Sequence, residues 1–332
     1  MNRTFHPGLL ALAAVVLLGG CGQGAGEGEP VQVIVPRGAS FGQVADSLVA
    51  REIVEQGTLF GLYARIKGKT GSIKPGGYAF RRGQDWDRIL DDLEAGRTTT
   101  VRLVIPEAWD LMRIGPRLAE LTGLDPDSVL EVLADSGTAR RLDVPGPTLE
   151  GYLYPATYSF PTGVPLDTVL GTLVATYLRL WTPGRRARAD SLGLSEREVV
   201  TLASIVEKEA RQLDEMPTIS AVYHNRLRIG MPLQADPTVQ YALGEHQNRL
   251  LYSHIDSVAD NPYNTYRNRG LPPGPIGSPS ERGIEATLYP ANVKYLYFVA
   301  RPDGSHVFTR TLAEHNRAKA ASRREQREAA PR

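Results

Sequence analysis

One pattern recurs three times near the start of the chain and limits the fold more than any other feature. In each copy an apolar run (residues 33–35, 78–80 and 103–105) is followed by a turn and by a residue suited to cap a helix: Ser40, Asp85 or Asp110. An apolar residue follows each cap after four and again after eight positions, as one face of an α-helix requires. The pattern predicts small strand-to-helix units and an α+β fold. Internal duplication and the ordinary start signal of such a unit both remain open as its origin.

Changes in composition divide the chain into five parts. Residues 1–21 are typical of a signal or anchor, and residues 22–30, rich in Gly and Glu, of a flexible tether. A small module is predicted over 31–98, because a Gly-Arg-Thr stretch ends it. We expect a larger, mainly helical domain over 99–318 and a charged tail over 319–332.

The N-terminus suggests export and anchoring. A basic Arg3 precedes an apolar run from Leu9 to Leu18, which is shorter than the roughly 20 residues of a membrane span. The run ends in Gly-Gly-Cys21, which resembles the lipobox of bacterial lipoproteins, so Cys21 is predicted to be lipidated. An ordinary signal peptide is the alternative. Cys21 is the chain's one cysteine, which excludes disulfides. The larger domain is therefore expected outside the cytoplasm.

Charge and motif content exclude several classes of protein. The 38 Lys and Arg residues balance 37 Asp and Glu residues, so the sequence shows no electrostatic footprint for nucleic acid. None of the six histidines has the spacing of a zinc helix. Walker, Gly-x-Gly-x-x-Gly and Gly-x-Ser-x-Gly patterns are absent. We expect no cofactor and no metal, and a neutral polymer or small molecule fits best as partner.

One predicted helix places carboxylates among apolar residues. Ser195 and Glu198 form a capping box at its start, and apolar residues continue to Ala210. At about 100° per residue Glu207 falls within the apolar arc, while Lys208 points to the opposite side and Glu209 lies near the edge.

Burial would raise the pKa of the Glu207 carboxyl toward the range of a general acid. A structural glutamate paired with an arginine such as Arg226 is the competing interpretation, and the helix pattern alone does not separate the two.

Two later segments, 230–238 and 261–276, concentrate amides, hydroxyls and aromatic rings among prolines and glycines. Residues 261–279 contain too many prolines and glycines for regular structure, and long loops of this kind often form binding sites. Sugars offer hydroxyls for hydrogen bonds and apolar faces for aromatic rings. The segments therefore favour a carbohydrate groove, although tight turns use the same residue types.

Eight short blocks stand out between about residues 31 and 318: 149–158 (LEGYLYPATY), 203–209 (ASIVEKE), 225–227 (NRL), 231–238 (MPLQADPT), 263–266 (YNTY), 270–276 (GLPPGPI), 296–299 (LYFV) and 306–308 (HVF). In sequence and in order, these blocks resemble the signature blocks of the MltG-type (YceG-like) endolytic murein transglycosylases. The resemblance implies a LysM-like N-terminal module followed by a catalytic domain with long Pro/Gly-rich loops, and it places the essential acid at Glu207.

Four positions depart from the family pattern. Ala108 and Ser280 stand where glycine is usual, Ser278 where asparagine is usual and Ala156 where aspartate is usual. The short leader also departs from the transmembrane helix that commonly anchors the family. None of these four positions is expected to touch the predicted acid.

The resemblance implies a reaction that needs one carboxyl group. A glycoside hydrolase normally uses two, whereas in a lytic transglycosylase the substrate's C6 hydroxyl replaces water and a 1,6-anhydro end results. The residues expected to orient the sugars are Gln234, Asp236, Thr238, Tyr263, Asn264, Thr265, Tyr266 and Glu150.

Two other functions remain open from the sequence. One is a non-enzymatic peptidoglycan-binding scaffold lipoprotein, and the other is a lysozyme-like hydrolase with Asp236 or Glu209 as second carboxylate. The expected location is the cell envelope, anchored in a membrane and facing the periplasm or the cell exterior. Expected partners are peptidoglycan glycan strands, and the family also implies penicillin-binding proteins and the cell-wall synthesis machinery.

Overall fold

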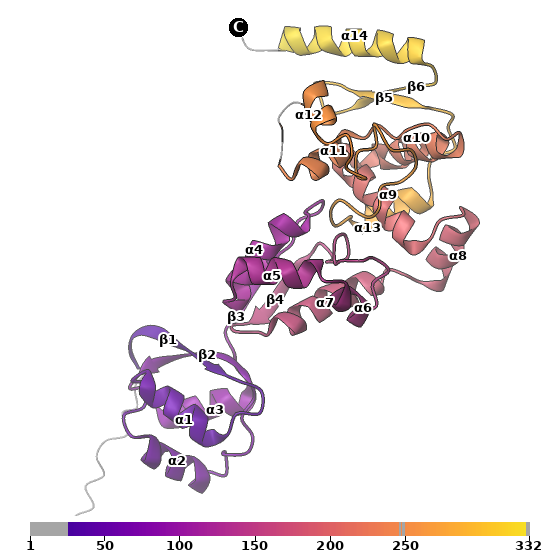
Figure 1. Cartoon of the computed structure of the whole chain (residues 1–332). Helices are drawn as coiled ribbons and strands as arrows, with labels where there is room; N and C mark the ends of the chain where they lie inside the picture. The colour runs from indigo at the N-terminus through magenta and orange to yellow at the C-terminus, as the bar shows by residue number, and fades with distance from the viewer. Residues whose placement is uncertain (1–25, 246, 248–249, 330–332) are drawn as a thin grey trace, which may run out of the picture. The chain divides into compact units, whose positions relative to one another are not determined.

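The chain folds into two compact units, which are described separately. The computed structural model describes residues 26–245, 247 and 250–329. Unit 1 extends to Thr99 and unit 2 begins at Thr100 (Figure 1). Both contain helices and short antiparallel strand pairs, so the predicted α+β class is confirmed.

Unit 1 combines a two-stranded sheet with three helices. Its elements are, in chain order, β1 (Glu27–Val35), α1 (Phe41–Ala50), α2 (Gly57–Ile66), β2 (Gly76–Arg82) and α3 (Trp86–Ala95). β1 pairs with β2 in antiparallel register, with Val33 opposite Tyr78. Ser40 and Asp85 cap α1 and α3 through side-chain hydrogen bonds, which confirms both predicted caps. The sequence pattern missed α2, whose N-cap Gln56 makes no side-chain cap.

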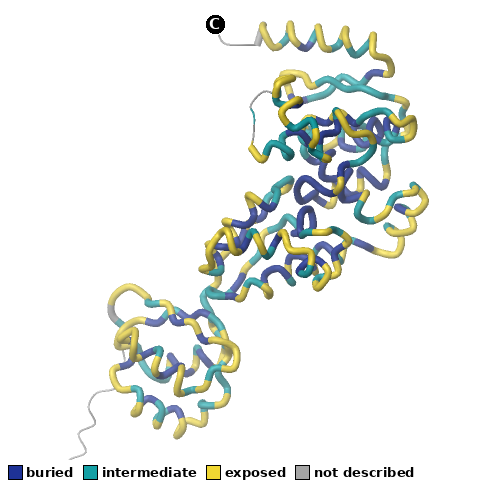
Figure 2. Tube along the Cα trace, viewed as in Figure 1, coloured by how far each residue is buried: buried dark blue, intermediate teal, exposed yellow. Residues whose placement is uncertain are grey.

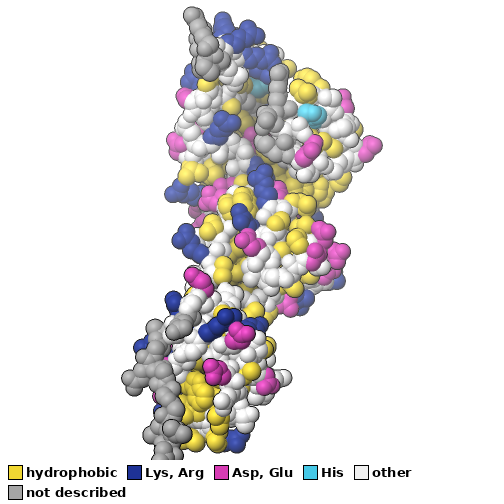
Figure 3. Space-filling model, turned by 90° about the vertical axis from the view of Figure 1, so that its left-hand side faces the viewer, with side chains coloured by type: hydrophobic (Ala, Val, Ile, Leu, Met, Phe, Trp, Pro, Cys, Tyr) yellow, Lys and Arg dark blue, Asp and Glu magenta, His cyan; other side chains and the backbone are white. Residues whose placement is uncertain are grey.

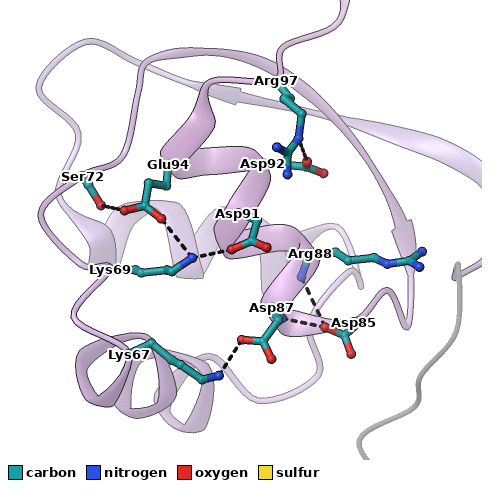
Figure 4. A network of polar contacts seen from close by, with 10 residues as sticks. All are labelled: Lys67, Lys69, Ser72, Asp85, Asp87, Arg88, Asp91, Asp92, Glu94 and Arg97. Carbon is teal, nitrogen blue, oxygen red and sulfur yellow. Dashed lines mark hydrogen bonds and ion pairs between the residues drawn. The ribbon is translucent and has the colours of Figure 1, made fainter.

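A polar network on the surface of unit 1 joins the segment after α2 to α3 (Figure 4). Lys69 bonds to Asp91 and lies 2.9 Å from a Glu94 oxygen, and Lys67 lies 3.1 Å from Asp87. Exposed pairs of this kind contribute roughly 0–1 kcal/mol each. The stability of the unit therefore comes mainly from its apolar core, which includes Phe60.

The first part of unit 2 packs five helices against a strand pair. Its elements are β3 (Thr100–Val104), α4 (Leu111–Thr122), α5 (Pro126–Ala134), α6 (Ser136–Arg141), β4 (Thr157–Pro161), α7 (Leu166–Leu178) and α8 (Pro183–Ser191). β3 pairs with β4 in antiparallel register. The Asp110 side chain accepts a hydrogen bond from Arg113 N–H and caps α4, which confirms the third predicted cap.

The second part of unit 2 surrounds one long central helix. Its elements are α9 (Glu196–Glu209), the 3₁₀ turn η1 (Leu213–Glu215), α10 (Met216–Arg228), α11 (Asp236–Leu243), α12 (Tyr252–Ser257), α13 (Glu281–Leu288), β5 (Tyr297–Ala300), β6 (His306–Thr309) and α14 (Leu312–Ala329). The β5–β6 hairpin lies between α14 and α10 (Figure 1). Ser195 and Glu198 form the predicted capping box at the start of α9.

Helix α9 is buried on nearly all sides because it contributes to two apolar clusters. Val199, Val200 and Ala203 belong to the cluster of the first part of unit 2. Leu202, Ile205 and Val206 belong to the cluster of the second part. Figure 2 shows the resulting buried stretch along the centre of unit 2. A polar side chain on this helix therefore lies close to apolar surroundings whichever way it points.

Residues 261–279 form turns and bends without helix or strand, as predicted. Lys and Arg side chains are interspersed with Asp and Glu side chains on the face shown in Figure 3. Among the described residues, no helix is both long and apolar enough to cross a membrane.

Candidate functional site

The carboxyl group of Glu207 lies two residues before the end of α9 and is almost buried, with 8% of the residue exposed. Its position follows from the local sequence. The capping box fixes the start of α9, and the apolar residues of the helix pack on both sides. Packing against the core on both sides holds the backbone at Glu207 rigidly, as a catalytic group requires.

The irregular segment 271–280 runs along one face of α9. At the start of the helix the Arg197 guanidinium donates to the carbonyl of Pro273. Further along, Ile276 N–H donates to Ser204 Oγ at 3.0 Å. Positions 197, 204 and 207 lie on one face of the helix because they are seven and three residues apart. The segment that follows this face therefore reaches the end of α9 at Glu207.

One oxygen of the Glu207 carboxyl is fixed by Ser280. Oε2 accepts a hydrogen bond from Ser280 N–H at 3.0 Å and another from Ser280 Oγ at 2.7 Å. Ser280 is the N-cap of α13, so Oε2 also faces the positive end of that helix. Among the described residues no hydrogen bond to Oε1 is found, which leaves this oxygen for a substrate.

Space beside Oε2 is provided by a glycine in the first turn of α13. A Cβ atom added to Gly283 would lie 2.5 Å from Glu207 Oε2, which is far inside van der Waals contact. Any side chain at this position would push the carboxyl aside, so the placement of Glu207 requires glycine here.

Opposing influences set the protonation of Glu207. Burial raises its pKa, and the nearby Glu107 carboxylate acts in the same direction. The two hydrogen bonds from Ser280 favour the ionised form and lower the pKa, but the net pKa stays above its ordinary value. A raised pKa keeps a larger fraction protonated near neutral pH, as a general acid needs.

A pocket of about 610 Å³ is lined in part by Ser280, which bonds to Glu207, and by Glu107, which raises the pKa of Glu207. Its lining is mostly charged, with one aromatic ring: Glu107, Tyr154, Arg185, Leu213, Ser280, Glu281, Arg282 and Glu285. Arg185 bridges Glu281 at 2.6 Å and Glu285 at 3.2 Å. Polar walls with one ring suit a hydrated ligand such as a sugar.

The alternative partner suggested for Glu207 was wrong. Arg226 is buried, but its guanidinium donates to the carbonyls of Leu296, at 2.7 Å, and Leu233, at 2.5 Å. It fastens the β5 region and the loop before α11 to α10. Arg226 is therefore not the partner of Glu207, and among the described residues no ion pair joins Glu207 to an arginine.

The neighbouring charged residues of α9 point elsewhere. Lys208, which was predicted to point away from the apolar side, is half-buried and lies 3.9 Å from Asp110. Glu209 is partly buried and accepts a hydrogen bond from Tyr223 Oη at 2.8 Å. Burial raises the pKa of Glu209 to about 7.

Two predicted sugar-binding threonines join the segment 231–238 to the segment 261–266. Thr238 Oγ1 and Thr265 Oγ1 lie 2.8 Å apart, and both residues are buried. Thr265 Oγ1 also accepts a hydrogen bond from Ala235 N–H at 3.0 Å. These hydroxyls therefore hold the two segments together.

The amide of Asn264 is likewise used within the protein. It donates to the carbonyls of Ile255 and Val258 at 2.9 and 3.0 Å, and its oxygen accepts a hydrogen bond from Tyr266 N–H. The side chain is fully buried, so it shapes the loop from within.

Other predicted sugar contacts are nearer the surface. Gln234 is exposed, with a positive φ of 48°. Asp236 is exposed and accepts a hydrogen bond from Tyr266 Oη. The partly exposed Tyr263 ring packs against Tyr241, with centroids 4.8 Å apart. Gln234, Asp236, Tyr263 and Tyr266 thus remain accessible to a ligand.

Glu150, also predicted to contact sugar, is buried with only 5% of the residue exposed. Its Oε2 accepts hydrogen bonds from Leu111 N–H and Tyr241 Oη, both at 3.2 Å. Within the described part of the chain Oε1 has no partner. Burial raises the pKa of Glu150 to about 8, so the group is mainly protonated at neutral pH.

Sequence reasoning missed three contributors to the site: Ser280, Gly283 and Glu107. The expectation that Ser280 does not touch the acid was wrong, because its N–H and its hydroxyl both bond to Glu207. A usable signal existed for Ser280, because Ile284 and Leu288 follow it after four and eight positions, as in the three repeated units. No local signal linked Glu107 or Gly283 to Glu207. Cys21 lies outside the described residues. Within them, no group of three or more His, Cys, Asp or Glu residues could hold a metal ion.

Comparison with known proteins identifies relatives that match most of the chain. The sequence pattern described as the YceG-like family matches residues 33–321. A Bacillus subtilis (strain 168) protein named endolytic murein transglycosylase is 34% identical over 307 residues, covering 87% of this chain and 84% of that protein. A protein of the same name from Streptococcus pneumoniae strain D39 is 29% identical over 317 residues, and the match covers 86% of this chain and 57% of that protein.

A solved structure supports the same assignment. The crystal structure of a YceG-like protein from Listeria monocytogenes is 33% identical and superposes with a TM-score of 0.60, covering 87% of this chain and 98% of that one. The family pattern spans most of the chain, and the solved relative spans both units. The chain therefore belongs to the YceG-like family.

Proposed function

We propose that this protein is an endolytic lytic transglycosylase that cleaves peptidoglycan glycan strands with Glu207 as its acid and base. The observation that carries the proposal is the Glu207 carboxyl itself. It is almost buried, one oxygen is fixed by Ser280, and the other has no hydrogen-bond partner among the described residues. Ser280 also lines a polar pocket. The names of the curated relatives point to the same activity, and they give no support to a non-enzymatic scaffold.

The reaction needs only this one carboxyl group. Protonated Glu207 gives its proton from Oε1 to the oxygen between N-acetylmuramic acid and N-acetylglucosamine, and the bond from that oxygen to C1 breaks. The carboxylate then takes the proton of the muramic acid C6 hydroxyl as O6 bonds to C1. The new end carries a 1,6-anhydro ring, and the acid is restored. Because the nucleophile belongs to the substrate, proximity can supply several kcal/mol of the rate enhancement.

The other carboxylates are less suited to a hydrolytic mechanism. Glu209 is bonded to Tyr223, and Asp236 is bonded to Tyr266. The acidic group that influences Glu207 electrostatically is Glu107, which would oppose loss of the proton and stabilise positive charge developing on the sugar. We assign that electrostatic role to Glu107.

Contacts to the sugars are assigned according to exposure. Gln234, Asp236, Tyr263 and Tyr266 are accessible and offer amide, carboxylate and ring surfaces. A second group of predicted sites is assigned the indirect role of holding the loops in place, because its side chains are buried and bonded within the protein: Thr238, Asn264, Thr265 and Glu150.

Unit 1 is proposed to bind peptidoglycan as a LysM-like module. The basis is its order of elements, strand, helix, helix, strand, with an antiparallel strand pair. Location in the cell envelope through lipidated Cys21 and contact with cell-wall synthases such as penicillin-binding proteins are further proposals, which rest on the sequence and on the family resemblance.

Products of digestion test the proposed function. Full-length protein in detergent should shorten long glycan strands to mid-length products early in the digest, and mass spectrometry should find 1,6-anhydro ends. Reducing ends would identify a hydrolase, and no cleavage would identify a scaffold. An early pool dominated by anhydro-disaccharides would show cutting from strand ends and contradict the endolytic assignment.

A further inference from the structure

Ser280 takes part in three hydrogen bonds around the acid. Its N–H and its hydroxyl both donate to Glu207 Oε2, at 3.0 and 2.7 Å, while the hydroxyl oxygen accepts from Gly283 N–H at 3.1 Å. A serine hydroxyl has one hydrogen to give and lone pairs to receive. The Gly283 contact therefore orients the hydroxyl, and its hydrogen points at the carboxyl.

This arrangement distinguishes the two oxygens of Glu207. Placing the acidic proton on Oε2 would disrupt two donor contacts, whereas Oε1 has no protein donor among the described residues. The proton therefore resides on Oε1, which is the oxygen free to reach a ligand. The second donor requires a side chain with a hydroxyl, because a glycine at position 280 would supply only the backbone N–H.

We propose that the Ser280 hydroxyl is a positioning group, which fixes the Glu207 carboxyl with Oε1 available to substrate and favours its ionised form. The proposal rests on the role of Glu207 as the acid. It implies that this chain works in a lower pH range than it would with glycine at 280, because the acid loses its proton more readily. Glu207 is favoured as an anion by the N-terminus of α13 as well, and that contribution remains when the hydroxyl is removed.

Other charged groups lie around the site, and they are the same in wild type and in the Ser280 variants. Glu107 comes from the segment before α4 and opposes ionisation of Glu207. Arg185 from α8 is paired with Glu281 and Glu285 of α13, and Arg282 is exposed at the pocket. On α9 itself, Lys208 is directed toward Asp110. A substitution at Ser280 leaves all of these charges unchanged.

The test compares the pH dependence of kcat/KM for wild type, Ser280→Gly, Ser280→Ala and Ser280→Thr, using full-length protein in detergent and purified glycan strands. Loss of the general acid's proton causes the fall in activity at high pH. Removing a hydrogen bond to the ionised form should move this fall upward by about one pH unit, a tenfold change in acid dissociation. At pH values where the kcat/KM of wild type has already fallen, Ser280→Gly and Ser280→Ala should then have a higher kcat/KM than wild type. The pH profile of Ser280→Thr should stay near that of wild type.

Ser195→Ala provides the matched control for loss of a helix cap. Ser195 caps α9 with its hydroxyl, but it makes no contact with Glu207. This variant should lose stability without moving the pH limit. If Ser280→Gly and Ser280→Ala behave in the same way, Ser280 is only a helix cap and the proposal is overturned.

An NMR titration separates this proposal from the proposed function. The Glu207 side-chain ¹³C signal, assigned by its absence in Glu207→Gln, should titrate about one unit higher in Ser280→Gly than in wild type. The titration does not depend on turnover. An unshifted signal overturns the role of Ser280, whereas a shifted signal in a protein that forms no anhydro ends supports that role and rejects the transglycosylase mechanism.

Discussion

Glu150→Gln should make the protein more stable than wild type at neutral and alkaline pH, and the gain should grow as the pH rises. In the folded protein Glu150 Oε2 accepts hydrogen bonds from Leu111 N–H and Tyr241 Oη, and Oε1 has no partner among the described residues. A glutamine oxygen can accept both bonds, and its NH₂ group takes the position of the protonated Oε1. The substitution therefore copies the neutral acid and removes the group that can ionise.

The magnitude follows from the pKa of Glu150, which burial raises from 4.5 to about 8. Between these values the folded state binds more protons than the unfolded state, so wild-type stability falls as pH rises. The slope is about 1.4 kcal/mol per pH unit for one such group. Over the whole interval between the two pKa values, wild type loses on the order of 5 kcal/mol of folding stability by pH 8. The variant does not suffer this loss.

Chemical denaturation of wild type and Glu150→Gln at pH 5, 6.5 and 8 measures the effect. The two proteins should be similar at pH 5, and the variant should gain several kcal/mol by pH 8. A difference that does not change with pH, or a variant less stable at pH 8, would refute the buried neutral acid. Activity should change little, because Glu150 is assigned an indirect role, and a large loss of kcat/KM with unchanged stability would instead place Glu150 in contact with the sugar.

Three further substitutions test other parts of the account. Gly283→Ala should lower activity about 100-fold because its Cβ would displace the Glu207 carboxyl. The control Gly171→Ala, where nothing lies within 4 Å of an added Cβ, should keep its activity and gain up to about 1 kcal/mol of stability from helix propensity. Equal activities of the two variants would contradict the close contact. Ala108→Gly should raise the free energy of unfolding by about 0.5–1 kcal/mol, since Ala108 has a φ of 62° that costs alanine more than glycine, and a destabilised variant in chemical denaturation would argue against strain. Cys21→Ser should leave the protein unprocessed or release it from membranes, and intact-mass analysis of the wild type that finds no acyl group on Cys21 would exclude lipidation.

Features encoded locally could be predicted from the sequence. Ser40, Asp85 and Asp110 were identified as helix caps because a cap and its helix lie within one short segment. The apolar pattern of α9 likewise indicated that Glu207 is buried. Helix α2 was missed because no capping side chain marks its start.

Contacts between distant segments could not be predicted in this way. Ser280 bonds to Glu207 across 73 positions, and Tyr241 bonds to Glu150 across 91. Both depend on how irregular segments pack against helices, which periodicity does not encode. The same limit applies to Asn264, whose polar side chain suggested sugar binding but fastens its own loop.

Product analysis of Glu207→Gln tests the central claim most directly. Glutamine keeps the size of the side chain and can accept both Ser280 hydrogen bonds, but it cannot transfer a proton. Anhydro-ended muropeptides, measured by mass spectrometry, should form at least about 100-fold more slowly than with wild type, while the melting temperature hardly changes and Glu209→Gln remains active. Continued release of anhydro ends by Glu207→Gln, or loss of activity in Glu209→Gln alone, would contradict the assignment of Glu207 as the acid.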